Sequence, residues 1–206
     1  SFVDGYYVNN IRKHLGYLLA KKETLYSKKY IVVGIPQTGI SYGKEYAKHK
    51  NLKYLQLIYK NPNVGRTFIL PTQEDRIKAC NNKFIYNESK LKNKNIIIVD
   101  DSIVRGNVIK SIIYNLKKCG VKEIHIRIPS PPVIDICELG IAIRSKTELL
   151  ANNNTIQKMT KELEVNSLEY LYADEIKFFP KHTYNQCFSG EISDEIKKWQ
   201  PIPISL

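Results

Sequence analysis

The stretch NIIIVDDSIVRGNV, residues 95 to 108, limits the fold of this chain more than any other feature of the sequence. Its β-branched apolar run is typical of a strand that is buried on both faces. Two acids, Asp100 and Asp101, follow at once, and a turn ending in Gly106 leads into a helical pattern. In open α/β sheets, ligands bind beyond the carboxyl ends of the strands. We therefore expect an α/β protein with a binding site at this turn.

The rest of the chain alternates between strand and helix patterns. Short apolar runs predict strands over 30–36, 52–60, 94–101, 122–132 and 138–145. Helical spacing predicts helices over 8–22, 40–50, 108–120, 146–151, 154–165 and 166–176. This alternation predicts a mainly parallel sheet flanked by helices. We expect a single domain over 1–206, with a helical lead-in over 1–29, an irregular loop over 60–83 and a helical extension over 152–206.

Composition excludes several classes of protein. With 43% hydrophobic and 25% charged residues, the chain resembles an ordinary globular protein. No apolar run approaches the ~20 residues of a membrane helix and no secretory signal is visible, so we expect a cytoplasmic protein. The four cysteines form no CxxC pair, which favours reduced thiols. The net charge of +12 fits either a solvated lysine-rich surface or an anionic ligand, and no nucleic-acid motif accompanies it.

The turn after the acids has the features of a phosphate site. Backbone N–H groups at a helix N-terminus bind anions, Ser102 adds a hydroxyl donor, and Gly106 allows close approach. Asp100 and Asp101 then need a different partner, such as ribose hydroxyls or Mg²⁺. The simpler alternative is that the two acids only cap the following helix. The complete pattern of strand, two acids, turn and helix favours a ribose phosphate with a metal-bound pyrophosphate.

The string VDDSIVRG resembles the phosphoribosylpyrophosphate (PRPP) motif of type I phosphoribosyltransferases. Other segments resemble glutamine PRPP amidotransferases in the same order: SFVDG, GIPQTG, KNPNVGRTFILPTQEDR, RIPSPP, KTELLA and NSLEYL. The resemblance implies the type I phosphoribosyltransferase fold with a mobile loop over the site. It also implies a transferase that forms 5-phosphoribosylamine and pyrophosphate from PRPP and ammonia, the first step of purine synthesis.

The resemblance assigns roles to particular residues. Asp100 and Asp101 would contact the ribose hydroxyls and Mg²⁺, with Thr38 as a further metal-side oxygen. Lys60, Arg66 and Thr67 would act from the loop that closes over PRPP. The PRPP-binding set would comprise Pro36, Gln37, Thr38, Gly39, Asp100, Asp101, Ser102, Ile103, Val104, Arg105, Gly106 and Asn107.

The sequence departs from the family at several positions. Asn107 stands where the family has threonine, Asn81 where it has arginine, and Ala142 where it has aspartate. Weak activity, altered substrate or lost activity are therefore open, as is a PRPP-binding regulator or a salvage phosphoribosyltransferase. Only Cys137 and Cys187 match ligands of the family's iron–sulfur cluster, so we expect no cluster.

The family's glutaminase half is expected to be absent from this chain. SFVDG resembles the family segment that follows the glutaminase domain. Either that domain lies outside this chain, or the chain is a stand-alone synthase that takes free ammonia or a partner's. The resemblance also implies a homo-oligomer.

Overall fold

The computed structural model describes residues 1–3, 5–25, 27–62, 83–136, 143, 145–176 and 185–191. Its centre is a five-stranded sheet in the order β4-β3-β7-β8-β9, in which every neighbouring pair is parallel. The strands are β3 (Tyr30–Gly34), β4 (Lys53–Tyr54), β7 (Asn95–Val99), β8 (Glu123–Ile128) and β9 (Ser167–Tyr170). The predicted parallel α/β architecture is therefore confirmed.

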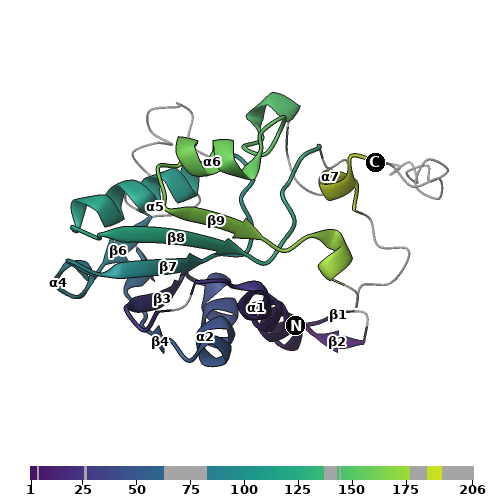
Figure 1. The fold of residues 1–206 in the computed structure, drawn as a ribbon. Helices are drawn as coiled ribbons and strands as arrows, with labels where there is room; N and C mark the ends of the chain where they lie inside the picture. The colour runs from purple at the N-terminus through teal and green to yellow at the C-terminus, as the bar shows by residue number, and fades with distance from the viewer. Residues whose placement is uncertain are drawn as a thin grey trace.

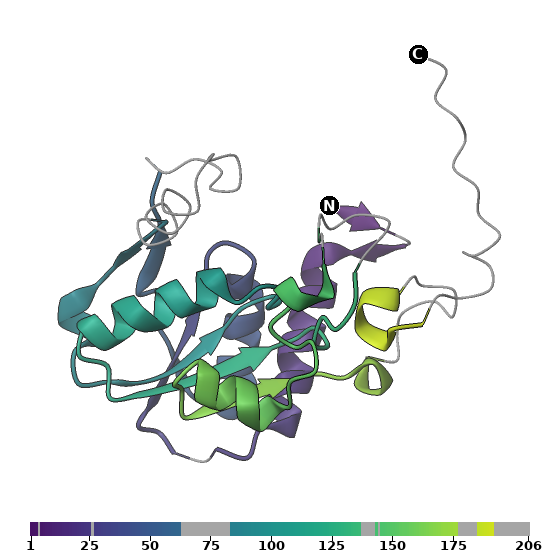
Figure 2. The same cartoon turned by 90° about the horizontal axis from the view of Figure 1, so that it is seen from above.

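Helices cover both faces of the sheet. Figure 1 shows α1 (Val8–Lys22) and α2 (Gly39–Lys50) below it, and α5 (Asn107–Lys118) and α6 (Ile156–Glu162) above it. In the view from above, the teal α5 and the light green α6 both lie on the near side of the sheet, with strands visible between them (Figure 2). In the part of the chain that the structure describes, no helix is long and apolar enough to cross a membrane.

The side chains of β7 alternate between two hydrophobic cores. Ile96 and Ile98 belong to the core between the sheet and α5, whereas Ile97 and Val99 belong to the core between the sheet and the helices α1 and α2. All four are completely buried. Because successive side chains of a strand point to opposite faces, a strand between two helical layers must be apolar at every position. This explains the unbroken run of isoleucines in the sequence.

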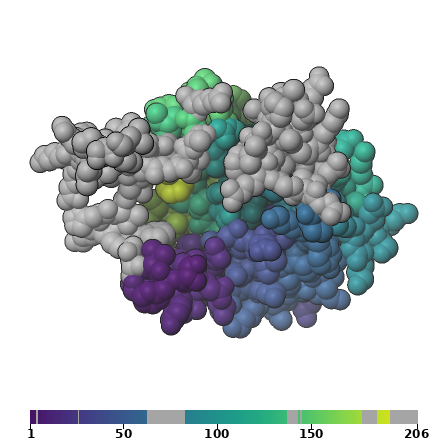
Figure 3. All heavy atoms as spheres, turned by 180° about the vertical axis from the view of Figure 1, so that it is seen from behind, coloured from purple at the N-terminus to yellow at the C-terminus, as the bar shows by residue number. Residues whose placement is uncertain are grey.

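The first two helices pack unusually closely. A Cβ atom on Gly16 of α1 would lie 2.5 Å from the carbonyl oxygen of Tyr42 in α2, so only glycine allows this approach. In the space-filling view from behind, the purple N-terminal residues and the blue residues around α2 form one continuous surface (Figure 3).

The sequence pattern of α5 determines both its orientation and its end. Ile109, Ile112, Ile113 and Leu116 recur at helical spacing and are buried against the sheet. Two lysines occupy the last turn, and Gly120 follows with φ +76°. Positive charge at a helix C-terminus and a left-handed residue just after it are both favourable. The predicted helix with its glycine terminator is confirmed.

The predicted single strand over 52–60 is wrong. Its first part forms β4, whereas its second part forms β5 (Ile58–Lys60), which pairs antiparallel with β6 (Phe84–Tyr86) outside the central sheet. Gln56 marks the break, because its side-chain amide donates to the carbonyls of Gly34 (3.1 Å) and Ile58 (2.6 Å). The strand β6 and the short helix α4 (Glu88–Leu91) were not predicted.

The helix predicted over 166–176 is also wrong. Residues 167–170 form β9, an edge strand whose Leu168 and Tyr170 are buried while Glu169 is exposed. This alternation has the period of two of a strand, which a short window does not distinguish well from a helix. Only the 3-10 turn η3 (Ala173–Glu175) is helical there. The strand predicted over 138–145 lies almost wholly outside the described residues.

Several short elements complete the described chain. The helix predicted over 146–151 is reduced to the 3-10 turn η2 (Lys146–Glu148), whereas that over 154–165 is confirmed as α6. The helix α7 (Gln186–Ser189) and the hairpin of β1 (Phe2–Val3) and β2 (Tyr6–Tyr7) were not predicted.

A buried ion pair connects the end of α1 to β8. Arg127 donates from Nε and Nη2 to the carboxylate of Glu23, the Nη2 bond being 3.1 Å long, and Tyr46 donates its hydroxyl to the same group. The side chains of Arg127 and Glu23 are only 2% and 1% exposed. Burial acts to raise the pKa of Glu23, but the hydrogen bond and charge of Arg127 outweigh it and hold the pKa below its ordinary value.

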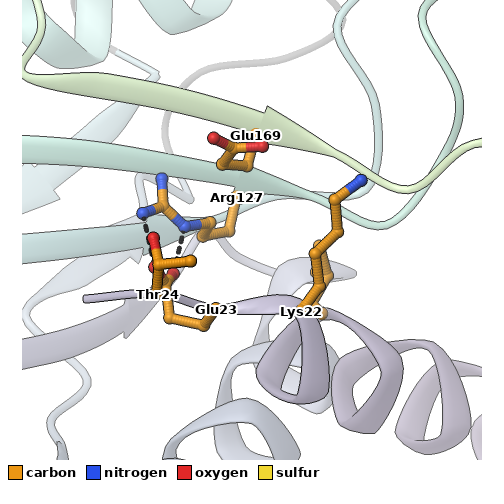
Figure 4. Close-up of a pocket in the computed structure, with 6 residues that line it drawn as sticks. Lys22, Glu23, Thr24, Arg127 and Glu169 are labelled. Atoms are coloured by element: carbon orange, nitrogen blue, oxygen red, sulfur yellow. Dashed lines mark hydrogen bonds and ion pairs between the residues drawn. The ribbon is translucent and has the colours of Figure 1, made fainter. Parts of the chain in front are cut away.

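A cavity of about 150 Å³ lies beside this ion pair. Figure 4 shows Glu169 from β9 above Arg127, and Thr24 next to the Glu23 carboxylate. The lining residues are Leu19, Lys22, Glu23, Thr24, Arg127 and Glu169. None of them belongs to the predicted PRPP-binding set, so the cavity is distinct from the site that the sequence predicts.

Candidate functional site

The two predicted acids lie where β7 ends. The N–H of Asp100 donates to the carbonyl of Arg127 on β8 (3.3 Å), which extends the pairing of the two strands by one residue. The N–H of Asp101 donates to Oδ1 of Asp100 (3.0 Å), and Ser102 Oγ donates to Oδ1 of Asp101 (3.0 Å). Both acids and Ser102 are half-buried. The chain therefore fixes two carboxylates side by side at the carboxyl edge of the sheet.

The pKa of Asp100 is raised at this edge of the sheet. Burial and then the charge of Asp101 raise the pKa of Asp100 to about 8, although the Asp101 N–H and the charge of Lys83 act in the opposite direction. Desolvation and a neighbouring negative charge both disfavour the ionised form of a carboxyl group. The edge thus has a local excess of negative charge that a cation or hydroxyl donors could relieve.

The predicted pyrophosphate loop packs directly against these acids. Ile35 donates its N–H to the carbonyl of Val99 (2.9 Å), which holds the loop after β3 against the end of β7. Gly39 begins α2, and a Cβ atom on it would overlap the Val99 carbonyl and lie 3.3 Å from Cα of Asp100. The Thr38 side chain makes no capping bond to α2, and Gln37 is exposed. The peptide bond between Pro36 and Gln37 is cis.

The predicted phosphate turn runs from Ser102 into α5. Gly106 precedes the helix with φ +79°, a conformation that glycine adopts without strain, and a Cβ atom on it would lie 3.3 Å from Leu150. Gly106 offers no side chain to cap α5, and the first turn of α5 contains no acid. The N-terminal N–H groups and the helix dipole therefore favour an anion at this turn.

The side chains of this turn differ in exposure. Arg105 and Asn107 are exposed, Val104 is half-buried, and Ile103 is buried in the core under α5. Ile103 and Val104 could therefore contribute to a phosphate site through their backbone only.

The predicted lid is described only at its two ends. Lys60 is exposed at the end of β5, and Asn61 donates its N–H to the carbonyl of Lys83 (2.9 Å). This bond keeps the two ends of the segment side by side. Arg66 and Thr67 lie outside the described residues, as do Asn81, Ala142 and Cys137.

Two residues that interact electrostatically with the acids, Lys83 and Tyr42, were not predicted as part of the site. The charge of Lys83 favours the ionised form of Asp100. Tyr42 on α2 shares a hydrogen bond with Arg12 of α1, and both aspartates help to raise its pKa, after the larger effect of burial. The sequence contains no local signal for these neighbours, because each belongs to an element other than the motif itself.

The cysteines add no metal centre in the described part of the chain. Cys187 is buried with Val133 and Leu149, and its carbonyl accepts the N–H groups of Ile134 (2.8 Å) and Asp135 (3.2 Å). Among the described residues, no group of three or more His, Cys, Asp or Glu side chains could hold a metal ion. Because Cys137 lies outside these residues, the expected absence of an iron–sulfur cluster stays a prediction.

Paired acids, a glycine turn and a loop against them lie together at the carboxyl edge of the parallel sheet, as the sequence led us to expect for a phosphoribosyltransferase. The family model for the phosphoribosyl transferase domain matches residues 8–129, and the chain belongs to this family. It has the type I phosphoribosyltransferase fold.

Within this family, the chain is similar to amidophosphoribosyltransferases. It is 37% identical to the Methanocaldococcus jannaschii enzyme over 83% of this chain and 36% of that protein. It is 30% identical to the Bacillus subtilis enzyme over 98% of this chain and 44% of that protein. The solved glutamine PRPP amidotransferase of B. subtilis, complexed with ADP and GMP, matches with a TM-score of 0.78 over 92% of this chain and 43% of that one. The chain thus spans less than half the length of these relatives.

Proposed function

We propose that this chain is the phosphoribosyl-transferring part of an amidophosphoribosyltransferase, which forms 5-phosphoribosylamine and pyrophosphate from PRPP and ammonia. The observation that supports this proposal is the close approach of Gly39, after β3, to the backbone of Val99 and Asp100 at the end of β7. A site with two anion-binding turns around one pair of carboxylates suits a sugar with a phosphate on one side and a pyrophosphate on the other.

Each part of PRPP has a matching part of the site in this proposal. The 5-phosphate binds the turn Ser102–Asn107 and the N-terminus of α5, where the first turn contains no acid to repel it. Asp100 and Asp101 accept hydrogen bonds from the ribose hydroxyls. Pyrophosphate binds the loop Pro36–Gly39, where the Thr38 hydroxyl makes no capping bond to α2.

The acid pair also suits Mg²⁺. Burial, and then the charge of Asp101, raise the pKa of Asp100, so a cation bound beside the two acids would favour its ionised form. Magnesium typically binds one or two carboxylates and completes its shell with phosphate oxygens and water. Asp100, Asp101 and Thr38 would hold it in this chain, and the metal would stabilise charge on the pyrophosphate when bound.

The reaction needs positioning more than activation. A bond forms between the ammonia nitrogen and C1 of the ribose, and the bond from C1 to the pyrophosphate oxygen breaks with its electron pair. The nitrogen then loses one proton to water or to the released pyrophosphate. The transition state has oxocarbenium character, as in other glycosyl transfers. Ammonia is already nucleophilic, so the protein must chiefly exclude water that would hydrolyse PRPP. Lys60, Arg66 and Thr67 would serve this purpose from the loop over 60–83.

The proposal also covers the location of the protein, its oligomeric state, its source of ammonia and the role of Asn107. We assign the chain to the cytoplasm and to a homo-oligomer, and we propose that its ammonia comes from a glutaminase domain or subunit. Asn107 supplies an amide where the resemblance leads us to expect a hydroxyl. The amide can still donate to a phosphate, so we expect PRPP to bind.

Pyrophosphate release tests this proposal. Purified protein is mixed with Mg²⁺, PRPP and ammonium at alkaline pH, and release is compared with a reaction without ammonium. Ammonium-dependent release is the expected result. PRPP binding without release would instead favour a regulatory protein, and release that requires a nucleobase would favour a salvage enzyme.

A further inference from the structure

A segment far along the chain contacts the turn proposed to bind the 5-phosphate. Arg105, one residue before the glycine that opens α5, donates from Nε to Oε2 of Glu148 (2.6 Å). Glu148 ends the 3-10 turn η2, which Ser145 caps by accepting the N–H of Thr147 (3.2 Å). The two residues of the ion pair are 43 positions apart in the sequence. The pair therefore connects two elements that no local sequence pattern relates.

Two further contacts connect the same segment to the same turn. Leu150 donates its N–H to the carbonyl of Val104 (2.9 Å). Its side chain covers Gly106, where a Cβ atom would lie 3.3 Å from Leu150 Cδ2. Leu149 packs with Val133 and Cys187, and the half-buried Val104 packs against that cluster. Residues 145–150 thus contact the turn Ser102–Asn107 in three ways: by a hydrogen bond to the Val104 carbonyl, by packing against Gly106, and by the ion pair with Arg105.

We propose that Glu148 is a positioning residue for phosphate binding, which acts through Arg105 and touches no substrate. Its carboxylate fixes the guanidinium beside the turn and balances its charge, so that the backbone N–H groups from Ser102 to Asn107 keep the arrangement that receives a phosphate. This inference rests on the proposed PRPP site, and it adds a residue that neither the motif nor the fold assigns.

The proposed role predicts a selective effect on one end of PRPP. The Arg105 and Glu148 side chains are 39% and 31% exposed, so their pairing contributes modestly to overall stability. Loss of the carboxylate should weaken binding of the phosphate at this turn, whereas pyrophosphate at the loop after β3 should bind as before. In turnover, the 5-phosphate is remote from the reacting C1, so KM for PRPP should rise more than kcat falls.

Direct binding measurements separate this inference from the catalytic proposal. Ribose 5-phosphate and magnesium pyrophosphate are titrated by NMR into the wild type and into Glu148→Gln, Arg105→Gln and the double variant. Glu162→Gln is the matched control, because it breaks the Lys110–Glu162 pair between α5 and α6, which has a similar length (2.7 Å) and exposure (45% and 40%).

We expect Glu148→Gln to weaken ribose 5-phosphate binding roughly fivefold, the order expected for a partly exposed ion pair. Pyrophosphate binding should not change, and Glu162→Gln should match the wild type. In the Arg105→Gln background, the effect of Glu148→Gln should disappear, because the two residues act as one unit.

Four results would overturn the inference. These are unchanged binding in Glu148→Gln, equal weakening of both ligands, a full effect of Glu148→Gln without Arg105, and a wild type that binds no ribose 5-phosphate. A wild type that binds ribose 5-phosphate with the expected pattern, but releases no pyrophosphate from PRPP with ammonium, would contradict only the proposed function.

Discussion

Gly39 lies so close to Val99 that a Cβ atom on the glycine would overlap the valine carbonyl oxygen. The same carbonyl accepts the N–H of Ile35 (2.9 Å). The carbonyl oxygen of Val99 therefore contacts both ends of the loop that joins β3 to α2, at Ile35 and at Gly39. The position of the loop relative to Asp100 is therefore set by backbone packing, which leaves little freedom for adjustment.

Replacing Gly39 with alanine should displace the loop from the acids. The colliding atoms are backbone, so relief requires movement of a whole segment, at a cost of about 1–3 kcal/mol in the free energy of unfolding. Misplacement by about 1 Å can cost roughly a hundredfold in rate. Urea unfolding and ammonium-dependent pyrophosphate release measure the two effects. Lys48→Ala, at an exposed position of the same helix, is the control, and equal behaviour of the two variants would contradict the packing argument.

Asp101→Asn should abolish PRPP turnover and leave the fold intact. The carboxylate stands at the strand end beside the phosphate turn and accepts the Ser102 hydroxyl (3.0 Å). The amide keeps the shape of the side chain but lacks the negative charge that binds a cation. We expect a loss in kcat of about a hundredfold or more, with an unchanged melting curve. Asp174→Asn, at an exposed position in η3, should retain full activity, and unchanged kinetics in Asp101→Asn would refute the role.

Glu23→Gln should destabilise the protein far more than the loss of an exposed ion pair does. The variant leaves the Arg127 guanidinium, 2% exposed, without its buried counter-charge. Breaking a buried pair in this way costs about 3–5 kcal/mol. Glu162→Gln, which breaks the exposed pair with Lys110, should cost less than about 1 kcal/mol. Urea unfolding at neutral pH measures both, and similar values for the two variants would show that Glu23 does not hold Arg127 in the core.

His125 should make the protein less stable in acid. Burial is the main cause that lowers the pKa of His125 below its ordinary value of 6.5. The unfolded state therefore binds a proton at a higher pH than the folded state does. The contribution of His125 to stability is complete above about pH 6.5 and is lost as the pH falls through the folded pKa, by up to about 1.4 kcal/mol for each pH unit.

The variant His125→Gln isolates this effect. Asp100 acts in the opposite direction, because its raised pKa favours the folded state at lower pH, and both proteins contain it. The difference in unfolding free energy between wild type and His125→Gln should therefore shrink as the pH is lowered from 7.5 to 5.5. Urea unfolding across that range provides the measurement, and a difference that does not vary with pH would count against a neutral buried imidazole.

The sequence predicted those parts of the fold whose signals are local and strong. The helices α1, α2 and α5 and the strands β3, β7 and β8 have clear periodicity or unbroken apolar runs. The strand β9 was mistaken for a helix, because it has only four residues and its neighbour β8 lies about 40 positions earlier in the chain. The division of 52–60 into β4 and β5 depends on the side chain of Gln56 and on pairing with β6. Pairing between distant segments decided both cases.

The site was predictable to the same extent. Asp100, Asp101 and Gly106 belong to one continuous motif, so their mutual geometry follows from the strand, turn and helix that contain them. The approach of Lys83, Tyr42 and Glu148 depends on tertiary packing. The local pattern of residues encodes the centre of the site, whereas distant segments supply its surroundings.

Formation of the bond between nitrogen and C1 is the most direct test of the central claim. PRPP labelled with ¹³C at C1 is incubated with ¹⁵N-ammonium, Mg²⁺ and the protein, and the C1 signal is followed by NMR against a protein-free control. The proposed function predicts a new C1 signal split by one-bond coupling to ¹⁵N, which appears together with free pyrophosphate. Pyrophosphate release that is equally fast without ammonium, or a PRPP signal that persists as in the control, would contradict it.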